Sequence, residues 1–549
     1  MTQREAILAR LAGLRYDLLV IGGGIVGAGI ARDAAMRGLK VALVEQGDFA
    51  SGTSSKTSKL IHGGLRYLEH GHLRLVFEGL RERHVLRTIA PSLVRPLPLL
   101  LPVYAGDARS VWKIRAGLWL YDLLAARHAL QPHRMLSARR TLEREPALRV
   151  DGLKAAGVYA DCHMDDARLC LMNILQATRF GAVCANYVRV TEFLKASGRL
   201  CGASVRDSFT GRSFNVRAAA VINATGPWGD RLRRLSEPSA QARLVPTKGA
   251  HLILPRLAQE AIFTQARSDS RLLFVLPWGA YTLVGTTEAP AGEALDDLAA
   301  SSDEVGYLLE EVNRLLPGSH VDEADIIATF AGARPLLSFG GRSATTASRE
   351  HAIEMDRWGL ISVLGGKFTT YRRMSQQAVD FVVSRYRWPA DRCLSDQVSL
   401  VETLHPVTLE YWHEVTRRLD PDLLGRCLLR YGAGTLPLLQ SLAKDPTLAQ
   451  PVCPHHEYIE AELVHALQEE FGCTLVDLLA RRTRIAWSSC QGLDALSRIT
   501  ELLQRYGGLS AAQVERQVDA YRRFLASGFS FRPPQPAEPD PQPQEVQRT

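Results

Sequence analysis

A glycine-rich segment near the N-terminus constrains the fold of this chain more than any other feature. It runs from Gly22 to Gly27 as GGGIVG and fits the pattern GxGxxG through Gly22, Gly24 and Gly27. The apolar run Tyr16–Ile21 before it predicts a buried parallel strand, and Val26–Arg37 after it predicts a helix rich in small residues. A strand, a glycine turn and a helix in this order predict the start of a doubly wound α/β domain.

Each glycine has a physical role in such a turn. Gly22 permits the tight turn from strand to helix, Gly24 lets the backbone approach a pyrophosphate, and Gly27 allows close packing of the helix on the strand. The helix N-terminus offers free N–H groups to that anion. A second strand, Lys40–Val44, ends at Glu45, whose carboxylate can accept hydrogen bonds from ribose hydroxyls and would repel a 2′-phosphate. The pattern predicts a bound dinucleotide and disfavours NADP.

A run rich in hydroxyl groups, Ser51–Lys59, follows the second strand. By composition alone it would be a solvated loop, but hydroxyls and small residues also suit a chain that passes beside a pyrophosphate and under an isoalloxazine ring. An NAD dehydrogenase needs no such segment, so we expect FAD as the cofactor. The residues of this stretch that we expect to bind FAD are Thr53, Ser54, Ser55, Lys59 and Leu60.

The length of 549 residues allows two or three domains. Short strands and helices alternate up to about Tyr386, which assigns residues 14–388 to cofactor and substrate domains. Residues 389–528 are predicted to form a helical domain, and the Pro-rich tail, 529–549, is expected to be disordered. The predicted helices of that domain are Val407–Leu419, Leu423–Tyr431, Tyr458–Phe471, Thr474–Ala486, Gln491–Tyr506 and Ala511–Ser527.

The charge of the chain, +8 with a pI near 9.0, favours an anionic partner such as nucleic acid, anionic lipid or a phosphorylated substrate. We find no nucleic-acid-binding signature and expect no nucleic-acid partner. Met1–Arg15 lacks the apolar core of a secretory signal, and Pro96–Tyr104 is far too short to cross a bilayer. Any membrane contact is therefore expected to be peripheral.

The nine cysteines form no CxxC pair, which argues against a zinc ribbon, an iron–sulfur cluster or a redox-active dithiol. Their irregular spacing indicates reduced thiols in a cytosol. Cys453 with His455 and His456 resembles a set of metal ligands, but no partner cluster is visible in the sequence. We therefore interpret this segment as a solvated loop and predict no metal site.

Longer motifs carry a family resemblance. The segment Ser54–His70, SSKTSKLIHGGLRYLEH, resembles the signature of the aerobic, FAD-dependent glycerol-3-phosphate dehydrogenases. The likeness covers about residues 14–525 in order, although Glu288 and Phe368 replace residues that are commoner in the family. It continues in Asp161-Cys162, Asp165–Leu169, Asn223–Trp228, Lys248–His251, Gly285–Thr287, Gly332–Leu336, Gly365–Arg372, Tyr458–Leu463 and Ala480–Thr483.

The resemblance implies a fold like that of D-amino-acid oxidases and glycine oxidases. This is an α/β fold in which a Rossmann-type FAD-binding domain is interleaved with a β-rich substrate domain, followed here by an all-helical C-terminal domain. In such folds the turn at Gly226 approaches the adenosine half of FAD. The turn that contains Gly366, Lys367, Phe368 and Thr369 leads to a helix whose N-terminus can face the flavin O2 edge.

The resemblance also implies an activity: oxidation of sn-glycerol 3-phosphate to dihydroxyacetone phosphate by hydride transfer to FAD, with electrons passed to membrane quinone. The alternatives are an oxygen-using glycerol-3-phosphate oxidase, a related flavin amine or amino-acid oxidase, and a non-enzymatic flavin sensor. We expect a homodimer in the cytoplasm, peripheral on the anionic cytoplasmic face of the inner membrane. Val111–Tyr121 mixes aromatic, apolar and basic residues as interfacial helices do, but its periodicity fits a buried helix equally well.

A substrate that carries a phosphate dianion needs fixed cations with several donors. Arg66, Arg334 and Lys367 each stand in a motif, beside or near glycine or proline at a predicted turn, and we expect them at the phosphate. By resemblance, hydroxyl hydrogen bonds to the substrate come from Tyr67 and one threonine of the pair Thr286 and Thr287.

Oxidation of an alcohol by hydride transfer also requires a base for the hydroxyl proton. Histidine is the default base because its pKa lies near neutrality. His62 and His251 are the candidates, and an orienting or packing role is an equal alternative for each. We count Arg334 with them as a catalytic residue.

Overall fold

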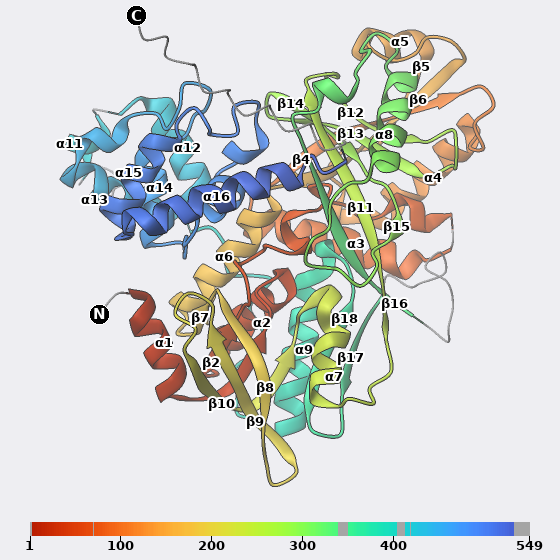
Figure 1. Cartoon of the computed structure of the whole chain (residues 1–549). Helices are drawn as coiled ribbons and strands as arrows, with labels where there is room; N and C mark the ends of the chain where they lie inside the picture. The colour runs from red at the N-terminus through yellow and green to blue at the C-terminus, as the bar shows by residue number, and fades with distance from the viewer. Residues whose placement is uncertain are drawn as a thin grey trace, which may run out of the picture.

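The computed structural model of the chain describes residues 3–69, 71–338, 350–402, 404, 412–417 and 419–531 (Figure 1). Two β-sheets form the body of the molecule. In Figure 1 the first sheet lies with its helices in the lower part of the view, the second lies above it to the right, and the C-terminal helices lie at the upper left.

The first sheet contains the predicted βαβ unit. Strand β1 (Arg15–Ile21) pairs in parallel with both β2 (Val41–Val44) and β10 (Ser213–Asn223). Its second half, Leu18–Ile21, is buried on both faces and is a continuous apolar run without alternation. Helix α2 (Ile25–Met36) connects β1 to β2 and packs against α6 (Asp166–Arg179) and α9 (Tyr371–Tyr386). In spatial order the strands are β17 (His351–Met355), β18 (Leu360–Gly365), β10 (Ser213–Asn223), β1 (Arg15–Ile21), β2 (Val41–Val44) and β7 (Val183–Ala185), with β9 (Arg199–Asp207) and β8 (Val188–Ala196) attached through β10.

The second sheet is almost entirely antiparallel, and only β12 and β4 pair in parallel among the strand pairs of its described residues. In spatial order its strands are β15 (Ala289–Pro290), β11 (Leu244–Pro255), β14 (Tyr281–Gly285), β13 (Leu272–Trp278), β12 (Ala261–Gln265), β4 (Val94–Tyr104), β6 (Leu153–Met164) and β3 (Leu60–Ile61), with β16 (Ala328–Leu337) beside β11 and β5 (Arg134–Ser137) beside β6. The remaining helices of this part of the chain are α1 (Gln3–Gly13), α3 (Leu73–Ile89), α4 (Val111–Ala125), α5 (Ala138–Arg144), α7 (Gly229–Ser236) and α8 (Ser302–Leu315).

The chain alternates between the two sheets. Strands β1 and β2 belong to the first sheet, β3 to β6 to the second, β7 to β10 to the first, β11 to β16 to the second, and β17 and β18 again to the first. This alternation confirms the predicted interleaving of a Rossmann-type domain with a β-rich domain. It also places the boundary between the domains where segments far apart in the sequence can line one cavity.

The C-terminal helices have an apolar core of their own, separate from the cores of the two sheets. They are α11 (His413–Thr416), α12 (Pro421–Tyr431), α13 (Thr435–Lys444), α14 (Glu460–Gln468), α15 (Leu496–Gly507) and α16 (Ala511–Ser527). Most of the predicted helix at 407–419 lies outside the described residues. The helix predicted at 474–486 is shorter in the structure. It ends in a π-helical turn, Asp477–Arg482, after which the Thr483 hydroxyl donates to the carbonyl groups of Leu478 and Leu479.

The described chain ends against the second sheet. Phe531 is buried in the core under that sheet, Phe529 packs beside it, and the Ser302 hydroxyl donates to the Phe531 carbonyl at 2.7 Å. The expectation of disorder from residue 529 is therefore wrong for 529–531, because these aromatic side chains have an apolar site to fill. The rest of the Pro-rich tail, 532–549, lies outside the described residues.

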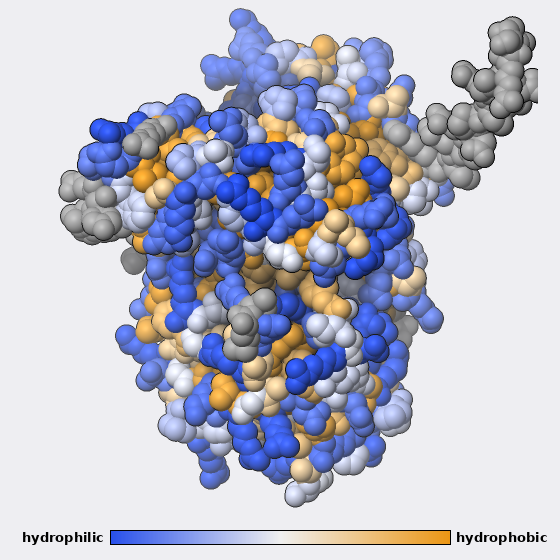
Figure 2. All heavy atoms as spheres, turned by 60° about the vertical axis from the view of Figure 1, so that its left-hand side comes forward, coloured by the Kyte–Doolittle hydropathy of each residue, from blue (hydrophilic) through white to orange (hydrophobic). Residues whose placement is uncertain are grey.

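Within the described ranges, no helix is both long enough and apolar enough to span a bilayer. Figure 2 turns the left side of Figure 1 forward and shows hydrophilic residues over much of that face, with smaller hydrophobic patches between them.

Candidate active site

A cavity of about 1060 Å³ is lined by residues of both sheets. It brings together most of the residues that the sequence nominates for cofactor and substrate. Those that line it are Gly22, Gly24, Glu45, Thr53, Ser54, Leu60, His62, Arg66, Tyr67, Gly226, His251, Thr286, Arg334, Gly366, Lys367, Phe368 and Thr369.

The glycine turn leaves room for a pyrophosphate at the start of α2. A Cβ at Gly24 would meet only the Ser54 hydroxyl, at 3.2 Å, and this hydroxyl accepts the Ile25 N–H at 2.9 Å. A Cβ at Gly27 would lie 1.9 Å from the Gly22 carbonyl oxygen, so this glycine is required by packing. The turn therefore holds an open cradle at the helix N-terminus, which fits the diphosphate of FAD.

Glu45 is held at the end of β2 by the backbone. Its two carboxylate oxygens accept the N–H of Gly23 at 2.7 Å and that of Gly47 at 2.8 Å. Burial raises the pKa of Glu45, and these N–H donors act against the rise. The fixed carboxylate lines the cavity, where it can accept ribose hydroxyls as predicted.

Two further turns, at Gly226 and Gly366, also line the cavity. Gly226 follows Thr225, whose hydroxyl donates to Asn223 Oδ1 at 2.7 Å, and it has a positive φ of 55°. Gly366 has a φ of 88°, which favours glycine, and the chain then runs through Lys367 into a short helical turn and α9. The long cavity, the open cradle and the fixed carboxylate together fit FAD.

Arg334 extends from β16 over the neighbouring strand β11. Its Nη2 donates to the Thr286 hydroxyl at 2.8 Å and to the Thr287 carbonyl at 3.2 Å. A Cβ at Gly249 would lie 2.3 Å from the same Nη2, so the guanidinium lies directly over this glycine. These hydrogen bonds hold the Arg334 guanidinium in one orientation, unlike a mobile charge on the surface.

The other two predicted cations line the same cavity. The Lys367 ammonium lies 3.6 Å from the centre of the Tyr67 ring, a cation–π contact that fixes both side chains. Arg66 is an exposed residue on the same short helical segment as Tyr67. All three predicted cations thus line the cavity, which suits an anionic substrate.

His251 lies on β11 two residues after Gly249, so its ring occupies the same face as the Arg334 guanidinium. Its Nε2 is 2.8 Å from the Ser58 hydroxyl, and its ring stacks on Phe330 with centroids 4.9 Å apart. Burial, followed by the charges of Arg334 and Lys59, holds the pKa of His251 well below its usual value of 6.5. The imidazole is therefore neutral at physiological pH, as a proton acceptor must be.

Nδ1 of His251 has no hydrogen-bond partner among the described residues. His62 also lines the cavity, and its backbone N–H donates to the Thr369 hydroxyl at 3.3 Å. Both predicted histidines therefore stand at the cavity, and His251 has the more defined surroundings.

Four residues that were predicted to bind cofactor or substrate do not line the cavity, namely Gly27, Ser55, Lys59 and Thr287. The structure gives each of them another role. The Thr287 hydroxyl donates to Glu304 at 2.7 Å and accepts the Ala250 N–H at 2.9 Å, so it supports the strand and does not face substrate. Lys59 pairs with Asp166 at 2.7 Å. The carbonyl of Ser55 accepts a hydrogen bond from the same lysine. Gly27 is required only for α2 to pack against the strand that precedes it.

Sequence reasoning missed two residues of the cavity. Ser58 holds the His251 ring, and Lys56 is a half-buried lysine whose pKa is lowered to about 8 by desolvation and by the charge of Arg481. Both lie inside the hydroxyl-rich run that was assigned to the cofactor as a whole. The sequence pattern does not indicate either residue. The role of Ser58 depends on His251, which is 193 residues away along the chain.

The fold and the glycine turn Gly22–Gly27 define the chain as an FAD-dependent oxidoreductase. Residues 17–372 match the family described as "FAD dependent oxidoreductase", and residues 363–514 match the "C-terminal domain of alpha-glycerophosphate oxidase". The glycine oxidase of Geobacillus kaustophilus shares the fold, at a TM-score of 0.53 and 22% identity over 70% of this chain and 98% of its own.

Similarity over nearly the whole chain narrows the family. The chain is 39% identical to a glycerol-3-phosphate dehydrogenase of Synechocystis over 93% of this chain and 96% of the relative. It is 36% identical to the human mitochondrial glycerol-3-phosphate dehydrogenase over 95% of this chain and 75% of the relative. The structure of the Bacillus halodurans glycerol-3-phosphate dehydrogenase complexed with FAD superposes with a TM-score of 0.79, at 26% identity over 96% of this chain and 98% of that one.

The chain belongs to the family of FAD-dependent glycerol-3-phosphate dehydrogenases, and FAD is its cofactor.

Proposed function

We propose that this protein oxidises sn-glycerol 3-phosphate to dihydroxyacetone phosphate. One observation carries the proposal: Arg334, Lys367 and His251 line the same cavity as the glycine turn Gly22–Gly27. The names of its relatives supply the substrate class. An anion-binding group of cations beside a neutral imidazole matches a substrate that has a phosphate at one end and an alcohol to be deprotonated at the other.

In this proposal the residues of the chain divide the work between binding and proton transfer. Arg334 and Lys367 bind the phosphate and so place the secondary hydroxyl near His251. Nε2 of His251, which already faces the cavity-lining hydroxyl of Ser58, accepts the hydroxyl proton. His62 is the second candidate for this base. When bound, FAD supplies the acceptor of the hydride that leaves the carbinol carbon.

Anaerobic addition of sn-glycerol 3-phosphate to the purified holoenzyme tests this function. We expect the oxidised flavin absorbance to bleach in a single turnover and dihydroxyacetone phosphate to appear in equal amount. Glycerol without phosphate, glycine and L-proline are the control compounds, and they should leave the absorbance unchanged. If an amino acid bleaches the flavin and glycerol phosphate does not, the protein is an amine or amino-acid oxidase and the proposal fails.

The electron acceptor is proposed to be membrane quinone rather than oxygen. Helix α4 supports a membrane-bound acceptor, because it buries Ile114 and Leu118 while Trp112, Trp119 and Leu123 remain 75%, 61% and 57% exposed. These three side chains are seven and four residues apart and therefore lie on one face of the helix. The helix thus has a buried face and an exposed aromatic face, and the exposed face supports the membrane proposal.

We infer that the exposed face of α4 rests on the cytoplasmic surface of the inner membrane. Neighbouring α3 packs against α4 and exposes Leu73 and Phe77. Lys113 and Arg115 flank the aromatic face and suit anionic lipid headgroups. An amphipathic helix of this kind lies in the interface without crossing it.

Flotation with anionic vesicles tests the membrane proposal. The double variant Trp112→Ala and Trp119→Ala should bind vesicles at least tenfold more weakly, while flavin reduction by substrate stays at the wild-type rate. Leu429→Ala is the matched control, since Leu429 is 50% exposed on α12 in the helical domain. Equal vesicle binding by all three proteins would contradict the proposal, and rapid peroxide formation with oxygen would identify an oxidase. A homodimer remains our expectation and can be checked by light scattering.

A further inference from the structure

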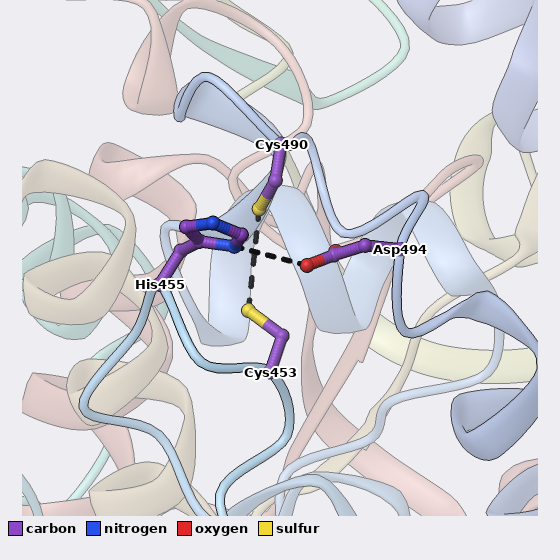
Figure 3. Close-up of side chains that lie close together, drawn as sticks. All are labelled: Cys453, His455, Cys490 and Asp494. Carbon is purple, nitrogen blue, oxygen red and sulfur yellow. Dashed lines mark hydrogen bonds and ion pairs between the residues drawn. The ribbon is translucent and has the colours of Figure 1, made fainter.

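Four side chains that can bind a metal meet in the helical domain, outside the residues that line the flavin cavity. Cys453 and His455 lie in the loop before α14, and Cys490 and Asp494 lie in the loop before α15. Their ligand atoms are within 4.8 Å of one another, and Figure 3 shows the side chains converging from the two loops. We call these four residues the C-terminal cluster. Its existence corrects the expectation that Cys453 and His455 form a solvated loop without partners.

The geometry of the C-terminal cluster is close to that of a four-coordinate metal site. The two Sγ atoms of Cys453 and Cys490 are 4.0 Å apart, and Nδ1 of His455 is 3.0 Å from a carboxylate oxygen of Asp494. Zinc bonds of about 2.0–2.3 Å in a tetrahedron place ligand atoms about 3.3–3.8 Å apart. Small side-chain rotations reach that arrangement. A disulfide would need about 2.05 Å between the sulfur atoms.

Backbone N–H groups donate to both sulfur atoms of the cluster. Cys490 accepts the backbone N–H of Gly492 at 3.4 Å, and Nε2 of His456 lies 3.3 Å from the same sulfur. Cys453 is hydrogen-bonded in the same way by the backbone N–H of His455, again two residues further on. Such N–H donors stabilise the negative charge that a sulfur ligand carries and orient it toward the metal.

We propose that the C-terminal cluster binds one Zn²⁺ as a structural site. Two thiolates, an imidazole and a carboxylate are ligands that zinc accepts in tetrahedral geometry, whereas Ca²⁺ and Mg²⁺ require mainly oxygen ligands. Four protein ligands leave no open position for a substrate. Zinc binding displaces the protons of the two thiols into solvent, and no oxidant or reductant takes part.

The position of the cluster gives the metal a mechanical role. The loop that carries Cys490 also contacts the second sheet, because the Ser489 N–H donates to the Tyr281 hydroxyl at 3.2 Å and Nε2 of Gln491 donates to the Ile327 carbonyl at 3.2 Å. A zinc ion would join this loop to the loop of Cys453, 37 residues earlier. It would thereby fix the attachment of the helical domain to the substrate sheet.

Zinc content and competition with a chromophoric chelator test the proposal on the holoenzyme purified under reducing conditions. We expect one zinc per chain and a melting temperature that falls when a strong chelator removes it. His455→Ala is the decisive variant: the side chain is 56% exposed, so its loss has little effect on folding without a metal. If His455 is a ligand, the variant should bind zinc more than about a hundredfold more weakly, beyond the loss typical of an outer-shell partner.

Cys473→Ser is the matched control, because Cys473 is a partly buried cysteine of the same domain that lies outside the cluster. It should keep one zinc with wild-type affinity. Substitution of the metal by Co²⁺ should give the thiolate charge-transfer and tetrahedral absorption bands in wild type and control, and lose them in Cys490→Ser. The proposal is overturned if the wild type retains no zinc, if His455→Ala binds zinc as tightly as wild type, or if mass spectrometry finds a Cys453–Cys490 disulfide in the purified protein.

Discussion

At the scale of single residues, the active site depends on side chains that are fixed by their neighbours. The Arg334 guanidinium lies over Gly249, and a residue with any side chain there would displace it. His251 is enclosed by Ser58 and Phe330 and is neutral because of burial and nearby cations. Arg334 as the proposed phosphate donor and His251 as the proposed base would therefore lose little freedom on substrate binding, which is the condition for efficient positioning.

Replacement of Arg334 by lysine tests the forked grip on the phosphate. An ammonium keeps the charge but cannot present two parallel N–H donors, and one charged hydrogen bond contributes about 1.5–3 kcal/mol. We expect kcat/KM of Arg334→Lys to fall roughly ten- to a hundredfold, with a smaller preference for glycerol 3-phosphate over glycerol. FAD content should remain that of wild type. Wild-type kcat/KM and selectivity in this variant would place the phosphate elsewhere.

The pH dependence of flavin reduction tests the base. Because the pKa of His251 is held well below 6.5, its imidazole stays neutral to lower pH than that of an ordinary histidine. If His251 is the base, kcat/KM should therefore stay level as pH falls from 8 through 6.5 and decline only at lower pH. His251→Asn should slow single-turnover reduction about a hundredfold or more and remove this acid limb. His62→Asn is the matched variant. If only His62→Asn slows the reaction, His62 is the base and His251 orients the substrate.

At the scale of elements, the turn from β1 to α2 uses its glycines in two different ways. A Cβ at Gly27 would overlap the Gly22 carbonyl, whereas a Cβ at Gly24 would meet only the flexible Ser54 hydroxyl. Gly27 is therefore needed for the helix to pack on the strand, and Gly24 for a ligand to approach the helix N-terminus. The same motif thus combines a folding requirement and a binding requirement.

Two alanine variants separate these requirements. Gly24→Ala should fold with a melting temperature close to wild type but bind FAD at least tenfold more weakly, because the methyl group occupies the space of the pyrophosphate. The bulkier Gly24→Trp should abolish FAD binding. Gly27→Ala should lose soluble protein or several degrees of melting temperature in the apo form as well. Calorimetry of the apo proteins and flavin titration measure both quantities, and full flavin content in Gly24→Trp would disprove the role of the turn.

At the scale of the whole molecule, buried ion pairs hold the helical domain to the FAD-binding domain. Asp48, directly after β2, accepts from Arg481 at 2.5 Å and from Arg482 at 2.5 and 2.8 Å. Arg168 on α6 pairs with Glu470 after α14, and both side chains are buried. Breaking such a pair from one side leaves an uncompensated buried charge, which costs far more than the pair itself contributes.

Asp48→Asn tests this attachment. The variant leaves the two buried guanidinium groups short of a counter-charge, so we expect the free energy of unfolding to fall by about 3–5 kcal/mol. Burial acts to raise the pKa of Asp48, but Arg482 and Arg481 outweigh it and lower the pKa to about 2. The unfolded state therefore binds a proton at higher pH than the folded state does. Stability is retained above about pH 5 and lost, by about 2–3 kcal/mol, as pH falls from 4 to 2.

Denaturant unfolding over this pH range measures the effect. The wild type should lose stability between pH 4 and pH 2, and Asp48→Asn should be less stable at pH 7 with a smaller loss below pH 4. Asp519→Asn, on the exposed surface of α16, is the control and should follow the wild type. If the stability of Asp48→Asn depends on pH as that of the wild type does, the ion pairs of Asp48 with Arg481 and Arg482 do not link the domains.

The sequence by itself determined the βαβ unit, the glycine turn at Gly24 and most of the predicted residues that line the cavity. These follow from local patterns, because an apolar run predicts a buried strand, glycine spacing determines a turn, and residues of one motif stay close together in the fold. Family resemblance supplied the substrate class and the interleaving, which periodicity alone does not give.

Only the tertiary structure decided which atoms meet across long separations. The Thr286 hydroxyl accepts from Arg334, while the hydroxyl of Thr287, one residue further, donates to Glu304. Lys59 pairs with Asp166, and Cys453 meets Cys490, because helix packing brings these segments together. Spacing along a chain specifies local geometry, but strand register and packing determine the contacts between segments, and so they fix both the orientation of His251 and the existence of the C-terminal cluster.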